Sequence, residues 1–158
     1  MRPDLQSSAP STAWVDARYF SLHVRSLVHE CHVPWRVVAL LAHVPSPTVR
    51  RLAGQGDRPL QRIRIIDAMR ILKVNIDDVE AARERVVPAG STRTRVLALH
   101  NSGCDTEDIA AMLGVTIPQA DALLNGEADM CTEMTRLRGR AACEARGLIS
   151  ASEPITSL

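Results

Sequence analysis

The feature that most constrains this chain is an internal repeat. At an offset of 71 residues, a pattern of small and apolar positions in the first half recurs in the second half. A period near 70 residues is too long for a solenoid, so it indicates two copies of one small folding unit. The matching pairs are Val38 and Ile109, Ala39 and Ala110, Val44 and Val115, Pro47 and Pro118, and Leu52 and Leu123.

Helical spacing dominates the sequence. Apolar residues recur three and four positions apart between Phe20 and Cys31, which predicts the buried face of a helix. Pro34 stands where a second helix begins, and Ser46 followed by Pro47 predicts a third helix with Ser46 as its N-cap. Only 3% of the residues are aromatic, and an aliphatic core favours small packed helices over a large sheet. We therefore expect an all-α fold.

Two further helix signals follow in the first half. Asn75, with Asp78 three residues later, is typical of a helix start. Before it, a polar loop at 55–59 leads into a predicted apolar helix face, which comprises Ile63, Ile66, Met69, Ile71 and Leu72.

The repeated segments, 35–52 and 106–123, match the requirements of a helix-turn-helix. Each has a small residue in the middle of its first helix, an apolar residue after the turn and a capped start to its second helix. Gly114 supplies the residue that tolerates positive φ at the turn of the second copy. The first copy has His43 there, which enters the left-handed region at some cost. Together these features predict two tandem helix-turn-helix modules joined by a short linker.

The module boundaries follow from composition. We expect a disordered N-terminal arm at 1–11, a basic module at 12–87, a linker at 88–92, an acidic helix-turn-helix-like module at 93–149 and a flexible tail at 150–158.

Charge divides along the same line. Residues 18–73 carry ten Arg or Lys against three acids, whereas residues 74–158 carry eight Arg against thirteen acids. An asymmetry of this kind indicates nucleic-acid contact on one side of the protein, and the basic side is the first module.

The second helix of a helix-turn-helix is the one that enters the major groove of DNA. Arginine can bind guanine there through two hydrogen bonds, and glutamine can bind adenine in the same way. In the first module, the predicted base-contacting residues are Ser46, Thr48, Arg50, Arg51 and Gln55. The predicted phosphate-contacting residues are Arg36, Arg58, Arg62 and Arg64.

The second module has the same pattern without the arginines. Its corresponding surface carries acids, and the phosphate backbone should repel it. We therefore expect this module to mediate homodimerisation or to bind a protein partner. If the first module holds it on the duplex, the residues that could still contact DNA are Thr116, Gln119 and Asn125.

Other classes of function lack sequence support. The four cysteines have no Cys-x-x-Cys spacing, so we expect reduced thiols and no metal site. No glycine-rich phosphate loop, catalytic Cys–His pattern or other cofactor motif occurs, so we expect neither a cofactor nor an enzyme. Without a stretch of about 18 apolar residues or a signal peptide, the expected location is the cytoplasm, in association with the nucleoid.

The sequence resembles a family of tandem helix-turn-helix proteins common in actinobacteria and their phages. The resemblance covers roughly residues 20–148 and rests on the runs HVRSLVHECHVPWRVVALLAHVPSPTVRRLAGQGDRPLQRIRIIDAMRILKV, VPAGSTRTRVLALHNSGCDTEDIAAMLGV and RGRAACEARGL. It implies a transcriptional regulator or phage repressor that binds double-stranded DNA. Members usually have glycine where this chain has His43, and they often continue with Gly-Trp where it has Gly147 and Leu148.

An adaptor is the alternative function. In that case the helical modules bind another protein, as in an anti-host phage protein, and the basic surface meets an acidic partner. Binding to random duplex DNA that weakens steeply with salt would favour the DNA-binding reading, and no binding at low salt would favour the adaptor.

Overall fold

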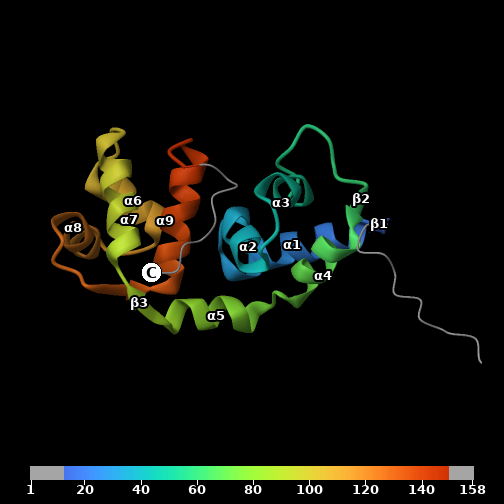
Figure 1. Ribbon diagram of the computed structural model, residues 1–158, viewed down its shortest axis with the longest axis horizontal. Helices are drawn as coiled ribbons and strands as arrows, with labels where there is room; N and C mark the ends of the chain where they lie inside the picture. Colours follow the sequence, from blue (N-terminus) through green and yellow to red (C-terminus); the bar gives the residue numbers. More distant parts are fainter. Residues whose placement is uncertain (1–12, 150–158) are drawn as a thin grey trace, which may run out of the picture.

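The computed structural model describes residues 13–149, so the predicted arm at 1–11 and tail at 150–158 lie outside the described residues. The described chain is mostly helical (Figure 1). The first repeat comprises β1 (Trp14–Asp16), α1 (Arg18–Cys31), α2 (Trp35–Ala42), α3 (Ser46–Leu52), β2 (Arg62–Arg64) and α4 (Ile65–Lys73). After α5 (Ile76–Glu84), the second repeat comprises β3 (Val86–Pro88), α6 (Gly90–Asn101), α7 (Thr106–Leu113), α8 (Ile117–Asn125), β4 (Met130–Thr132) and α9 (Glu133–Ala145).

Each repeat is closed by a short antiparallel strand pair. β1 pairs with β2, and β3 pairs with β4, over three residues each. The predicted helical class is confirmed, but an entirely helical fold is not, because these strands are present. Three-residue strands are too short to give a clear alternating pattern in the sequence.

The strand pairs fix where the flanking helices begin. In the first repeat, the Ala17 amide donates to the Gln61 carbonyl (2.9 Å) and the Ile65 amide donates to the Ala13 carbonyl (2.8 Å). The second repeat has the same two bonds, from Ala89 to Asp129 (2.9 Å) and from Glu133 to Arg85 (2.8 Å). Both copies therefore hold their first and last helices together through the same backbone contacts.

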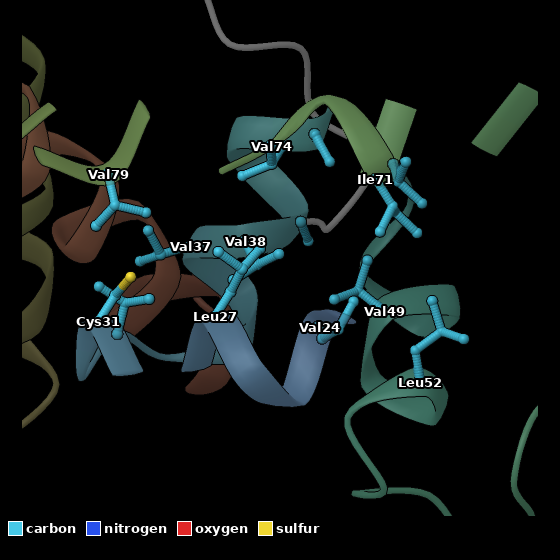
Figure 2. Packing of buried hydrophobic residues seen from close by; sticks show 14 of the residues in the cluster. Val24, Leu27, Cys31, Val37, Val38, Val49, Leu52, Ile71, Val74 and Val79 are labelled. Atoms are coloured by element: carbon cyan, nitrogen blue, oxygen red, sulfur yellow. The ribbon is translucent and has the colours of Figure 1, made fainter. Parts of the chain in front are cut away.

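The core of the first repeat lies where α1, α2, α3 and α4 meet (Figure 2). Figure 2 shows Leu27 of α1 beside Val38 of α2, and Val24 of α1 beside Val49 of α3; Leu52 of α3 is fully buried in the same cluster. Aliphatic side chains supply this core, as the low aromatic content predicts.

Helix α9 belongs to both cores. Met134, Leu137 and Ala141 pack into the cluster formed by the first repeat, whereas Cys143 belongs to the cluster of the second repeat. The two repeats are therefore packed against each other through α9, as well as connected along the chain through α5.

The predicted linker at 88–92 occupies regular structure instead of a loop. It contains the end of β3 and the first turn of α6, with Ala89 1% exposed and Thr92 fully buried. A Cβ built at Gly139 of α9 would lie 3.8 Å from Thr92 Cγ2, so α6 and α9 approach closely here. The small residues that resemble a linker in the sequence are the ones that allow this packing.

Several local predictions can be compared directly with the structure. Asn75 caps α5, and Asp78 completes a capping box with it, as predicted. Pro45, and not Ser46, is the N-cap of α3, so that prediction is wrong. Helix α4 buries Asp67, Ala68 and Ile71, whereas the predicted core residues Ile66, Met69 and Leu72 are exposed.

Within residues 13–149, no helix is both long and apolar enough to cross a membrane.

Candidate nucleic-acid interface

A tight turn sets α3 across the end of α2. His43 follows α2 in the left-handed region, with φ 55° and ψ 41°, and the Val44 amide donates to the Ala39 carbonyl (3.1 Å). From α4, Arg70 Nη1 donates to the His43 carbonyl (3.4 Å). In the second repeat, Gly114 takes the same conformation with φ 67°. The turn residue is therefore left-handed in both copies, although only one copy has the glycine that suits it.

Helix α3 has one buried side and one outward side. Val49 and Leu52 are fully buried, whereas Pro47, Arg50 and Arg51 are exposed. Figure 1 shows α3 at the outside of the first repeat, with the chain arching from its end to β2. The predicted orientation of its arginines, away from the core, is thus observed.

Ser46 and Thr48 differ from the exposed positions that the sequence predicts. Ser46 is only 6% exposed, because Pro45 caps the helix and places Ser46 inside its first turn. Thr48 is half-buried. The accessible polar side chains of this surface are therefore Arg50, Arg51 and Gln55.

Arg51 shapes the loop that follows α3. Its guanidinium donates to the carbonyl oxygens of Arg58 (3.2 Å, from Nε) and Pro59 (3.4 Å, from Nη2). Arg50 has no such contact in the described chain. We infer that the two neighbours have different roles. Arg51 holds the loop in place, whereas the guanidinium of Arg50 is available to bind a partner.

Arg36, one of the predicted phosphate-contacting residues, is paired with a carboxylate and only partly exposed. Its Nε lies 3.4 Å from Glu144 Oε1, in an ion pair not aligned as a hydrogen bond, and its guanidinium carbon lies 4.2 Å from the centre of the Trp35 ring. Its side chain is 28% exposed. Because α9 brings this carboxylate to α2, Arg36 is already neutralised by the chain itself.

The other phosphate candidates are exposed. Arg62 and Arg64 flank the buried Ile63 on β2, and Arg58 lies in the preceding loop. Arg62 Nη2 also donates to the Trp14 carbonyl (3.1 Å), which ties it to β1. Asp16 lies opposite Arg62, but it is engaged by Arg18, whose hydrogen bonds are the main reason that the pKa of Asp16 is lowered.

Sequence reasoning missed Arg25 on α1. It is exposed, and a Cβ built at Gly54 would lie 2.8 Å from Arg25 Nη2. Gly54, with φ 78°, thus lets this guanidinium lie against the end of α3. The only sequence signal is that Arg25 falls outside the apolar stripe of its helix.

The surface formed by Arg25, Arg50, Arg51, Arg58, Arg62 and Arg64 is called the basic face below. Across residues 13–149, none of these six arginines forms an ion pair with a carboxylate. A pocket of about 680 Å³ lies beside α3 at one side of this face. Arg50, Arg51 and Arg58 line it, together with Arg36 and the acids Asp57 and Glu144.

The equivalent surface of the second repeat differs in its polar groups. Thr116 Oγ1 accepts from the Gln119 amide (3.3 Å), and Gln119 Oε1 accepts from the Thr116 amide (2.9 Å). Thr116 and Gln119, two of the three residues predicted to contact DNA here, therefore form the capping box of α8 instead. Asn125, the third, is exposed, and so are the acids Asp121 and Glu127 beside it.

Over the same described range, no group of three or more His, Cys, Asp or Glu side chains is arranged to hold a metal ion. No known protein family, curated protein or solved structure matches the chain.

Proposed function

We propose that the protein binds double-stranded DNA through the basic face and acts as a transcriptional regulator or repressor. In this proposal the two repeats are tandem helix-turn-helix modules, and α3 lies in the major groove. Occupancy of an operator then blocks or recruits the polymerase. Such a protein would work in the cytoplasm, on the nucleoid or on phage DNA.

One observation carries the proposal: an exposed helix after a tight turn presents arginines that no carboxylate of the described chain neutralises. Arg50 is the foremost candidate for a base contact, and Gln55 lies just beyond the helix. A bidentate arginine–guanine contact contributes about 1–3 kcal/mol of discrimination. Arg25, Arg58 and Arg64 would meet flanking phosphates.

The second repeat has a supporting role in this proposal. Its exposed acids oppose contact with phosphates, and Ile117 on α8 is 48% exposed. We propose that this repeat pairs with a second copy or with another protein, since one short recognition helix provides limited affinity on its own.

The test begins with selection of bound duplexes from a random library, followed by anisotropy titration of the enriched sequence. We expect Arg50→Ala to lose the preference for that sequence while it retains binding to random duplex. Arg64→Ala should weaken both kinds of binding and reduce the salt slope of log K by about one. Arg146→Ala, an exposed arginine on the second repeat, is the matched control and should change neither.

Two outcomes would contradict the proposal. The first is no enrichment and no binding at low salt, which would favour an adaptor that binds an acidic protein. The second is a sequence preference that survives Arg50→Ala, which would remove α3 from the role of recognition helix.

A further inference from the structure

The second repeat contains a pocket of about 640 Å³ that DNA recognition does not explain. It lies between α7, α8, β4 and the first half of α9, and its walls are mainly apolar. Small-molecule sites typically have volumes of about 300–1,000 Å³ and apolar walls with a few polar groups. Leu113, Val115, Leu123, Met130 and Met134 supply most of the apolar side chains.

Two arginines are the charged groups among the lining residues. Arg83 comes from α5 and Arg138 comes from α9, and no acidic residue lines the pocket. Burial lowers the pKa of Arg138, and the positive charge of Arg83 lowers it further. Two cations therefore lie close together beside an apolar cavity, and an anion placed there would relieve their repulsion.

The nearby carboxylate of Glu80 forms an ion pair with only one of the two arginines. Arg83 forms an ion pair with Glu80, which precedes it on α5 and is about half exposed. Arg138 has no carboxylate partner in the part of the chain that the structure describes. Gly114 is the reason that Arg138 can reach this place, because a Cβ there would collide with its guanidinium.

We propose that this pocket binds a small amphipathic carboxylate. Its apolar body would lie against the accessible apolar side chains Val115, Ala122 and Met130, and its carboxylate would accept hydrogen bonds from Arg83 and Arg138. The planar guanidinium fork matches a carboxylate through two parallel hydrogen bonds, which favours this group over a single-point acceptor.

The same two arginines connect the pocket to the first repeat. Arg83 Nη2 donates to the Cys31 carbonyl, and Arg138 Nη2 donates to the His32 carbonyl (3.2 Å). Both acceptors lie at the end of α1, the helix that carries Arg25. A bound carboxylate would compete for these donors, so occupancy of the pocket is coupled to contacts of the DNA-binding repeat. This coupling rests on the proposed function, whereas the binding site itself does not.

The site can be tested without DNA. The probe is 8-anilinonaphthalene-1-sulfonate, displaced by octanoate or by 1-octanol, which has the same hydrocarbon chain without the charge. We expect octanoate to displace the probe at concentrations at least tenfold lower than octanol. Arg138→Gln and Arg83→Gln should each weaken octanoate at least tenfold and leave octanol unchanged. Arg85→Gln, an exposed neighbour outside the pocket, is the matched control.

A pocket-filling variant guards against indirect effects. Ala122→Leu adds side-chain volume inside the cavity and should abolish displacement by both compounds, with the circular dichroism spectrum unchanged. Equal potency of octanol and octanoate would overturn the proposal, and so would undiminished octanoate binding in Ala122→Leu or in both arginine variants.

A final arm separates this inference from the proposed function. Anisotropy of the selected duplex is measured with and without octanoate, and we expect at least a threefold change in affinity that Ala122→Leu removes. Octanoate binding without any DNA binding would refute the function but keep the site. Octanoate binding that leaves DNA affinity unchanged would refute the coupling alone.

Discussion

Substituting the residues at the two equivalent turns tests the account of the repeat. His43 and Gly114 both adopt left-handed backbone, with φ of 55° and 67°. Left-handed backbone costs a residue with a Cβ about 1–2 kcal/mol. The His43 side chain is exposed and forms no hydrogen bond in the described chain, so its replacement loses no such contact, and Arg70 binds only its carbonyl.

The magnitudes follow from these terms. His43→Gly removes the left-handed cost but adds about 0.5–1 kcal/mol of chain entropy in the unfolded state. The net gain is therefore about 0–1.5 kcal/mol, which raises Tm by up to about 6 °C in a chain of this size. Gly114→Ala reverses both terms and also displaces the Arg138 guanidinium, so we expect a loss of about 1–2 kcal/mol.

Thermal unfolding followed by circular dichroism measures both variants. Gly139→Ala is the matched control, because the same chemical change occurs there inside α9, with ordinary contact distance to Thr92. This control should be neutral or stabilising by up to about 1 kcal/mol. A lower Tm for His43→Gly, or an unchanged Tm for Gly114→Ala, would refute the reasoning that backbone conformation dominates at these turns.

Three further perturbations probe separate contacts. Asn75→Ala removes the capping box of α5, and chemical denaturation should report a loss of about 1 kcal/mol. Glu144→Gln leaves the half-buried guanidinium of Arg36 without its carboxylate; a loss of about 1 kcal/mol is expected, and an unchanged midpoint would argue against the ion pair. Iodoacetamide should label Cys131 before Cys31 and Cys143, because burial raises the pKa of the Cys31 and Cys143 thiols; mass spectrometry measures the order of labelling. Burial favours the protonated form of these two thiols in the folded protein. Their contribution to the free energy of unfolding is therefore complete below pH 9.0, the ordinary thiol pKa, and is lost as the pH rises through their raised pKa values in the folded state.

Local signals in the sequence predicted most of the helices and the two helix-turn-helix turns, although not every helix boundary. The offset of 71 pairs Ala39 with Ala110 and Leu52 with Leu123, and all four residues are buried in the structure. The left-handed turn at His43 could be predicted because a glycine occupies the matching place in the other copy. Repetition within one chain thus substitutes for an alignment where packing demands the same residue type twice.

Contacts between distant residues could not be predicted in this way. The pairing of Arg36 with Glu144, and the bond from Arg138 to the end of α1, join residues more than a hundred positions apart. Each depends on how α9 packs against the first repeat, which no local pattern encodes. Arg51 was predicted to be exposed, but its bonds to the following loop depend on the path of a loop without regular structure.

The two copies show how one scaffold permits two surfaces. Buried positions such as Val49 and its counterpart Ala120 must fill the same interior, so they remain apolar. The outward positions have no such constraint, and α8 exceeds α3 by a full half-turn, with nine residues against seven.

The loops that follow α3 and α8 also differ in length and charge. The loop after α3 spans 53–61 and carries Arg58, whereas the loop after α8 spans only 126–129 and contains two acids. A longer loop costs little additional closure entropy, so the first repeat can extend its basic face without disturbing its core. The second repeat, with its shorter loop, instead borders the open pocket that Arg138 lines. Divergence at the surface has therefore given the copies opposite charge and different cavities on the same backbone plan.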